Sequence, residues 1–265
     1  MLNTLKENKY HTHVKNYVDQ QTEYRYIKLL GIGSYGVAYL IEKPSSDEKF
    51  VLKRMKAKHR NNRKLREKFH FEIQLLREIG LPNTPSVISQ GMIKDVPFYI
   101  MEYINGQTFE QEIFIEGKTF TVEQSLKITS QLLENVILFH QKGIVHRDLR
   151  IPNILMKEEQ LYIIDFGLAA YIKQDVNIKE VDNPKKAENH LSDLYFIGHF
   201  LLFLLYSNYT PTQRKERSWQ EELQIPPSLI EFIERLLLIR EPFMNAEDAL
   251  TSLSNLIEHS YVLTD

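Results

Sequence analysis

The chain of 265 residues contains no cysteine. This absence excludes disulfide bonds, zinc sites built from thiolates, iron–sulfur clusters and a cysteine nucleophile. Long apolar runs are also missing, because the most apolar stretch, residues 191–206, is interrupted by Asp193 and His199 and is too short to span a bilayer. Residues 1–26 are polar throughout and do not resemble a signal peptide. We therefore expect a cytoplasmic protein that makes no use of a membrane.

The two signs of charge nearly balance, with 33 Lys and Arg residues, 35 Asp and Glu residues and a net charge of -2. This balance makes a dedicated nucleic-acid binder an unlikely class. Hydrophobic residues make up 43% of the chain and charged residues 26%, as in ordinary globular proteins. One basic block stands out: residues 53–68 hold nine Lys or Arg and a single acid, Glu67. We expect a solvated turn and helix start there, with the docking of an acidic partner as the alternative.

The hydrophobic pattern divides the chain into a β-rich front and a helical back. Short runs rich in aromatic and aliphatic residues predict strands at 24–30, 37–41, 49–55, 86–93 and 97–103. A helix is expected over 61–79, ended by Gly80. After Asn105–Gly106 the pattern predicts a helix over 122–141, a short hairpin at 154–164, and helices from residue 191 onward. Two lobes joined by a short hinge are the natural interpretation.

Three glycines, Gly31, Gly33 and Gly36, form a G-x-G-x-x-G pattern. In a dinucleotide-binding protein this loop would open a helix, but here residues 37–41 continue as a strand. Backbone amides of such a strand–loop–strand hairpin can cover nucleotide phosphates, because glycines allow close approach. No Gly-Lys-Ser/Thr follows, so the pattern is not a Walker loop. A simple tight turn is the alternative.

Two charged residues lie beside apolar neighbours in this first part. Lys53 is on the next predicted strand, where its amine could reach phosphate oxygens under the hairpin. Glu72 borders the apolar face of the predicted helix, and a carboxylate in that position favours a cation partner. We interpret the two as a pair; the alternatives are a solvated lysine and a glutamate on the rim of an amphipathic helix.

A second group of polar residues follows the long predicted helix. In His146-Arg-Asp148-Leu-Arg-Ile-Pro-Asn153, the aspartate is a candidate base for a hydroxyl nucleophile. Asn153, together with Asp165 of an Asp-Phe-Gly sequence, offers hard oxygen ligands. One carboxylate and one amide oxygen, completed by substrate phosphates, are typical of Mg²⁺ sites.

In this order and spacing the motifs resemble those of the eukaryotic-type (Hanks-type) protein kinases over about residues 24–258, in particular the small single-domain bacterial serine/threonine kinases. The resemblance implies an α+β, bilobal protein-kinase-like fold in one kinase domain. Residues 1–23 would be an N-terminal extension, 24–104 an N-lobe with an antiparallel sheet and one helix, and 105–265 a mostly helical C-lobe. It also implies ATP with Mg²⁺ or Mn²⁺ as cofactors, and transfer of the γ-phosphate to a protein hydroxyl, with Ser or Thr expected.

The resemblance further implies a role for each matched residue. The catalytic residues would be Asp148, Lys53, Glu72 and Arg150, and the metal ligands Asn153 and Asp165. The ATP-binding residues would be Leu30, Gly31, Gly33, Ser34, Gly36, Ala38, Val51, Lys53, Met101, Glu102, Ile104 and Leu155. Asp193 would brace the catalytic loop as structural support. Ala38 and Val51 exchange the family's usual valine and alanine, which keeps the total volume of the adenine site.

The segment after Asp165-Phe-Gly departs most from the family. Only 25 residues separate Gly167 from Asp193, no Ala-Pro-Glu is present, and residues 168–191 contain no Ser or Thr. We therefore expect activity without phosphorylation of this segment, with an acidic residue as the partner of Arg147. The candidates for that acid are Asp175, Glu180 and Asp182. Two other functions stay open: a small-molecule kinase of the aminoglycoside or choline phosphotransferase type, and a catalytically silent nucleotide-binding scaffold.

Overall fold

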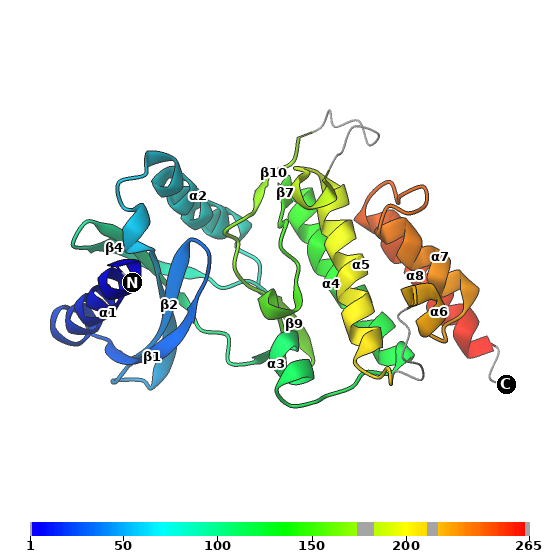
Figure 1. Ribbon diagram of the computed structural model, residues 1–265, viewed down its shortest axis with the longest axis horizontal. Coiled ribbons are helices and arrows are strands. Elements are labelled where there is room, and N and C mark those ends of the chain that lie inside the picture. Colours follow the sequence, from blue (N-terminus) through cyan, green and yellow to red (C-terminus); the bar gives the residue numbers. More distant parts are fainter. Residues whose placement is uncertain (1, 174–182, 211–216, 263–265) are drawn as a thin grey trace. The chain divides into compact units, whose positions relative to one another are not determined.

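The computed structural model describes residues 2–173, 183–210 and 217–262. The chain forms two compact units, Met1–Asn105 and Gly106–Asp265 (Figure 1). The first unit contains a sheet and two long helices, and the second is mostly helical. This α+β composition confirms the expected division into a β-rich front and a helical back.

A five-stranded antiparallel sheet with the order β1-β2-β3-β5-β4 forms the centre of the first unit. Each predicted strand is present, with small shifts of its ends. The strands are β1 (Arg25–Ile32), β2 (Gly36–Lys43), β3 (Glu48–Met55), β4 (Val87–Ile93) and β5 (Val96–Glu102). Because side chains alternate between the two faces of a strand, neighbouring residues of β3 serve opposite sides of the sheet.

Helix α2 (Arg63–Ile79) packs through Phe69 against Tyr99 of β5, with ring centroids 5.5 Å apart. It begins where the side chain of Asn62 accepts a hydrogen bond from the N–H of Leu65. It ends at Gly80, whose φ of +50° is the left-handed conformation that glycine adopts without strain. The predicted helix and its predicted end are therefore confirmed.

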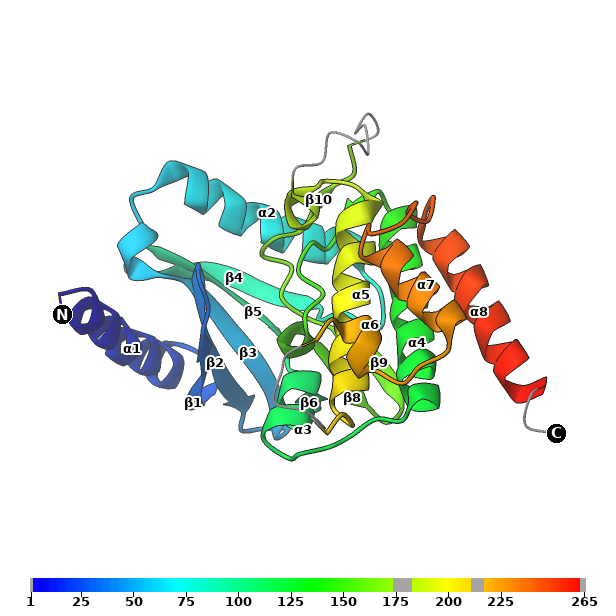
Figure 2. The ribbon, with the colours of Figure 1, turned by 45° about the vertical axis from the view of Figure 1, so that its right-hand side comes forward.

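Residues before the first strand form a second long helix, α1 (Leu2–Gln21), which Figure 2 shows on a different side of the sheet from α2. Val14 and Val18 are fully buried, and they form one cluster with residues of four strands. Those strand residues are Val37, Tyr39, Ile41, Leu52, Ile93, Phe98 and Ile100. The N-terminal segment is thus part of the compact first unit.

The second unit is built around the buried helix α5 (His190–Tyr206), which explains the apolar run noted at 191–206. The other helices are α3 (Phe109–Phe114), α4 (Val122–Gln141), α6 (Trp219–Glu222), α7 (Pro227–Leu236) and α8 (Ala246–Val262). Helix α4 starts with reciprocal capping bonds between Thr121 and Gln124. Within the described ranges, no helix is both long enough and apolar enough to cross a bilayer.

Short strands hold the polar motifs of the second unit. One small sheet contains β6 (Gln107–Thr108), β8 (Ile154–Lys157) and β9 (Gln160–Ile163), and the other contains β7 (Ile144–Val145) and β10 (Ala170–Tyr171). The His-Arg-Asp loop connects β7 to β8, and Asp165 follows β9. The two motifs are therefore fixed at the ends of paired strands.

Candidate active site

The glycine-rich segment forms the tip of the hairpin between β1 and β2, as predicted. The N–H of Gly33 donates to the carbonyl of Gly36 over 3.0 Å, and Gly31 and Ser34 are exposed. Gly36 is buried, and a Cβ atom there would lie 3.1 Å from Cε of Lys53. The third glycine therefore leaves room for the side chain of Lys53.

The Lys53 amine lies 2.5 Å from Oε1 of Glu72, so the expected pair forms. The two side chains are only 13% and 5% exposed, which makes this ion pair largely buried. The hydroxyl of Tyr99 donates to the same Glu72 oxygen over 2.9 Å. No sequence pattern pointed to Tyr99, although it lies directly opposite Lys53 in the β3–β5 ladder. A buried carboxylate with two donors is well fixed in position.

Three of the residues expected around adenine, Ala38, Val51 and Met101, lie on the same face of the sheet as Lys53. Ala38 is opposite Lys53, and Val51 is opposite Met101. Leu30 lies at an irregularity of the β1–β2 ladder and is 40% exposed. The two remaining backbone candidates of the first unit are Glu102, at the end of β5, and Ile104, which follows it.

The backbone N–H of Glu102 donates to the carbonyl of Ser86 over 3.0 Å. A contact from Glu102 to a base would therefore use its carbonyl and not its N–H. Leu155, the expected floor of the adenine site, is buried on β8 of the second unit.

In the second unit the carboxylate of Asp148 is surrounded by two partners from its own loop. The guanidinium of Arg150 binds both carboxylate oxygens, with Nη2 2.9 Å from Oδ2. The amide nitrogen of Asn153 donates to Oδ2 over 2.8 Å and to the Asp148 carbonyl over 2.9 Å. Because both hydrogens of this amide are used, its Oδ1 is the atom that remains for a cation.

The loop that carries Asp148 is braced by Asp193 of α5, which is fully buried. Its oxygens accept the N–H groups of His146 over 2.9 Å and of Arg147 over 2.7 Å, and Nε2 of His140 lies 3.0 Å away. Burial would raise the pKa of Asp193, but these partners outweigh it and lower the pKa overall. Arg147 has a φ of +64°, an unfavourable conformation that these bonds hold in place.

The Asp-Phe-Gly segment is anchored by Phe166, which is 1% exposed. Its ring meets His146 edge-on, with centroids 4.6 Å apart, and Phe139 at 5.5 Å. His146 is buried, and this burial lowers its pKa, so the ring is neutral near pH 7. In the neutral form its Nδ1 accepts the N–H of Asp148 over 3.2 Å. The ring thus links the two motifs.

Asp165, the second expected metal ligand, is exposed and has a φ of +62°. One of its oxygens accepts the N–H of Gly167 over 3.3 Å. Across the described residues, no group of three or more His, Asp or Glu side chains could hold a metal ion by itself. Asn153 and Asp165 supply hard oxygen donors, which suit an ion that takes its other ligands from phosphates and water.

Arg147 pairs with Glu188, an acidic residue that the sequence did not indicate as its partner. Its Nη1 lies 3.4 Å from a carboxylate oxygen of Glu188, and its Nη2 donates to the carbonyl of Lys186 over 2.9 Å. Lys173 binds the other Glu188 oxygen over 2.6 Å. The three acids proposed for this role, Asp175, Glu180 and Asp182, lie outside the described residues.

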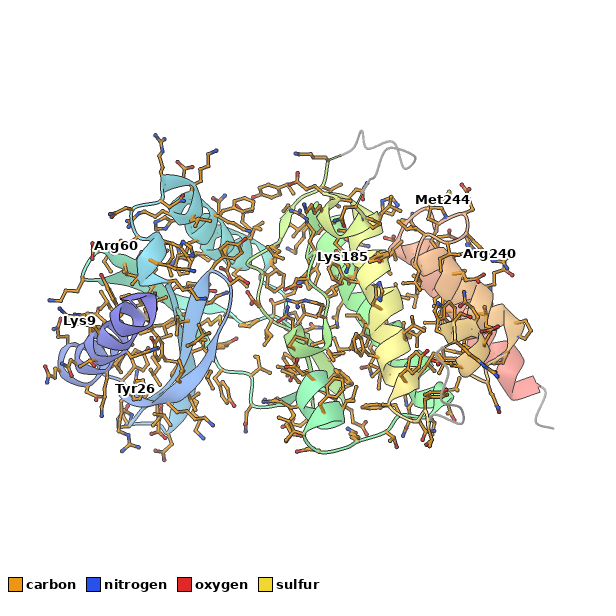
Figure 3. All side chains as sticks on the ribbon, in the orientation of Figure 1. Lys9, Tyr26, Arg60, Lys185, Arg240 and Met244 are labelled. Atoms are coloured by element: carbon orange, nitrogen blue, oxygen red, sulfur yellow. The ribbon has the colours of Figure 1, made fainter. Side chains whose placement is uncertain are left out.

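The basic block is not the uniformly solvated segment that we expected. Arg54 is fully buried, because it faces Glu7 of α1 and not solvent. Other members also have partners within the first unit: Arg60 pairs with Asp95, Arg63 with Glu67, Arg66 with two carbonyl groups, and Lys68 with the ring of Tyr35. Figure 3 labels Arg60, whose Nε lies 3.0 Å from Asp95. The charge excess in the sequence thus overstates the charge available to a partner.

Comparison with known proteins gives consistent matches. The protein kinase domain family matches residues 24–186. The probable serine/threonine-protein kinase YbdM of Bacillus subtilis is 32% identical over 245 residues, which cover 92% of this chain and 93% of that protein. The serine/threonine-protein kinase PrkC of the same organism is 27% identical over 196 residues, covering 69% of this chain and 30% of PrkC. A probable myosin light chain kinase of Dictyostelium discoideum is 27% identical over 160 residues, 59% of this chain and 50% of that protein.

Proposed function

The chain belongs to the protein kinase family, and from this premise we propose that it transfers the γ-phosphate of ATP to serine or threonine hydroxyls of a protein substrate. The observation that carries the proposal is the arrangement around Asp148, whose carboxylate is held by Arg150 and Asn153 beside an amide oxygen suited to a cation. The names of the relatives YbdM and PrkC favour serine or threonine as the acceptor.

We propose that the first unit binds the nucleotide. Backbone amides of the Gly31–Gly36 hairpin would cover the phosphates, and the amine of Lys53, oriented by Glu72, would bind the α- and β-phosphates. The remaining expected residues of this unit would contact the adenine, namely Leu30, Ala38, Val51, Met101, Glu102 and Ile104. A domain organisation of extension 1–23, N-lobe 24–104 and C-lobe 105–265 belongs to the same proposal.

Asp148 would accept the proton of the acceptor hydroxyl as the hydroxyl oxygen attacks phosphorus. Both of its oxygens bind Arg150 in the described arrangement, so Arg150 competes with an incoming hydroxyl for the acceptor positions of the carboxylate. The γ-phosphate is the competing anion, and a guanidinium binds phosphate well. We therefore propose that the nucleotide draws Arg150 away from Asp148, which makes the base more accessible when a phosphate is present.

Mg²⁺, or Mn²⁺ in its place, would be held by Asn153 and Asp165 and would neutralise charge on the phosphates. Activity would not require phosphorylation of the segment after Gly167, since Arg147 has Glu188 as its anionic partner. A cytoplasmic location and a further acidic partner at residues 53–68 remain predictions.

The test is transfer from γ-labelled ATP with Mg²⁺, comparing the wild type with Asp148→Asn and with Glu134→Gln. Glu134 is an exposed carboxylate on α4 and serves as the matched control. Each is incubated with a generic protein, with itself alone and with a metabolite pool. We expect label on Ser or Thr of protein, an Asp148→Asn rate lower by about 10²- to 10⁴-fold, and an unchanged control.

Two results would contradict the proposal. Label found only in small molecules would favour a small-molecule kinase, and ATP binding with no transfer to any acceptor would favour a silent scaffold. Replacing Mg²⁺ by Mn²⁺, and removing both with a chelator, tests the metal requirement in the same assay. Loss of transfer on chelation, with recovery on either ion, is the expected result.

A further inference from the structure

Two neighbouring residues of β3 make ion pairs on opposite faces of the sheet. Lys53 pairs with Glu72 of α2 on one face, over 2.5 Å. Arg54 faces Glu7 of α1 on the other, with Nη2 and Oε2 2.9 Å apart. Since the two residues share a peptide plane, a displacement of one changes the position of the other.

Arg54 is held by α1 and the sheet together. Its side chain is 0% exposed and that of Glu7 is 15% exposed. Its Nε donates to the hydroxyl of Tyr39 over 3.0 Å, and its Nη1 donates to the carbonyl of Met55 over 3.1 Å. The guanidinium carbon lies 5.6 Å from the ring centre of Tyr10 and 5.7 Å from that of Tyr39. A buried arginine in this position needs its anion, because removing one partner of a buried pair is strongly destabilising.

Helix α1 also holds the connection between β3 and α2. The hydroxyl of Tyr10 donates to Asp95 over 3.0 Å, and the same carboxylate pairs with Arg60 in the segment that leads into α2. Arg66 in the first turn of α2 donates to the carbonyl of Asp95 over 3.0 Å. Both elements that carry the Lys53–Glu72 pair are thus connected to α1.

The apolar part of this contact is small. Among the α1 residues whose side chains the structure describes, Val14 and Val18 are the fully buried aliphatic ones. The other described contacts of the helix to the sheet include a hydrogen bond between His11 and Tyr39 and an aromatic contact between Tyr17 and Phe98. The match to the protein kinase domain family begins at residue 24, after the end of α1. The family match therefore includes β3 but not α1, the helix that contacts it.

We propose that α1 is a positioning element of the nucleotide site: Glu7, through its pair with Arg54, holds β3 so that Lys53 stays in register with Glu72 and with the phosphates. This inference rests on the proposed role of Lys53 in binding ATP. Glu7 pairs with Arg54, on the face of β3 opposite to the Lys53–Glu72 pair, so its effect passes through β3. Small displacements of a binding group can have large effects on a reaction.

The test is a double-mutant cycle on ATP affinity in the full chain. Binding of ATP with Mg²⁺ is measured by calorimetry for wild type, Glu7→Gln, Lys53→Met and the double variant, well below the lowest melting temperature. We expect Glu7→Gln to weaken binding roughly three- to thirtyfold in the wild type, and to have no further effect once Lys53 is replaced. Thermal stability should fall by the same amount in both backgrounds.

The matched control is Glu234→Gln in the second unit. Glu234 pairs with Arg240 over 2.5 Å and its side chain is 12% exposed, similar to Glu7. This substitution should lower the melting temperature and leave ATP affinity unchanged. Should Glu7→Gln not fold, Glu7→Asp replaces it in the cycle, because it keeps the charge and only shortens the side chain.

The possible outcomes separate this inference from the proposed function. If the wild type does not bind ATP, or if Lys53→Met binds it equally well, the proposed nucleotide role fails and the inference fails with it. If Lys53→Met weakens binding and the Glu7 variant does not, only the inference is overturned. Equal weakening in both Lys53 backgrounds would also overturn it, because α1 would then act through general stability alone.

Discussion

The two units of the molecule hold their polar groups in different ways. In the first, Lys53 and Glu72 are 19 residues apart and come from a strand and a helix. They meet only because α2 packs against the sheet. In the second, Asp148 and Asn153 are 5 residues apart on one loop. One carboxylate, that of Asp193, accepts two backbone N–H groups of this loop.

This difference predicts how each site responds to change. The arrangement in the first unit depends on many packing contacts, so a remote substitution should shift it gradually. The loop in the second unit depends on a few hydrogen bonds to the side chain of Asp193. A substitution should therefore either leave the loop conformation intact or abolish it.

Replacing Asp193 by alanine should be the most damaging change. Two N–H groups of the loop would lose their acceptor, and removal of one partner from a buried ionic network costs about 3–5 kcal/mol. We expect a loss of this size in urea unfolding, together with loss of kinase activity. The control is Asp248→Ala on α8, where the side chain is 34% exposed and the cost should stay below about 1 kcal/mol. A cost equal to that of the control would contradict the bracing role.

In the first unit, two glycines of one hairpin should respond differently to alanine. A Cβ atom at Gly36 would lie 3.1 Å from Cε of Lys53 and 3.2 Å from the Arg54 carbonyl oxygen, whereas one at Gly31 meets nothing within 4 Å. Gly36→Ala should therefore cost about 1–3 kcal/mol and weaken ATP binding by displacing Lys53. Gly31→Ala should leave stability within about 0.5 kcal/mol. Melting curves and calorimetry measure the two effects, and equal stability losses would show that Gly36 has no special packing role.

Removing the charge of Glu188 should have a moderate effect on activity and a small effect on stability. Its side chain is 31% exposed and that of Arg147 is 19% exposed, so the pair contributes less than about 1 kcal/mol. We expect Glu188→Gln to lower activity severalfold and to reduce its dependence on salt, while Glu188→Asp retains most of it. If mass spectrometry instead finds that active enzyme requires phosphate within residues 168–191, the assignment of Glu188 is wrong.

The smallest effect is on the pH dependence of stability. Burial lowers the pKa of His146 and of His199 below the ordinary value in the folded state. The unfolded chain therefore binds protons first as pH falls below about 6.5, and stability that is complete above that pH declines on acidification. His199→Gln should make this decline shallower by about 1 kcal/mol or less. Urea unfolding at about pH 7.5 and pH 5.5 measures the difference, and an unchanged slope would contradict it.

Regular patterns and local motifs were predictable from the sequence. Helices α2 and α4 repeat apolar residues at the helical period, and the five strands are rich in aromatic and aliphatic residues, so their positions follow from these patterns. The pairing of Lys53 with Glu72 was also expected, because a charge beside an apolar stripe needs a partner. The His-Arg-Asp and Asp-Phe-Gly motifs indicated their loops because the motif residues lie close together in the chain.

Contacts between distant parts of the chain were not predictable in this way. Among the described side chains of α1, Val14 and Val18 are the fully buried aliphatic ones, so the sequence pattern indicates no more than an N-terminal extension. Tyr10 and Asp95 are 85 residues apart, and neither position attracts attention alone. Arg54 was grouped with its basic neighbours because composition does not reveal which cation faces a buried acid. Glu188 lies C-terminal to Asp175, Glu180 and Asp182, the three acids expected as partners of Arg147.

The buried pair of Glu7 and Arg54 has a consequence for how this chain can change over evolutionary time. Losing either charge alone leaves the other buried without a counter-ion, whereas replacing both by well-packed apolar residues is neutral or stabilising. Substitutions at the two positions should therefore occur together. Homologues with an apolar residue after the strand lysine should also lack the acid in the first helix, and an alignment that includes the helix would record this as covariation.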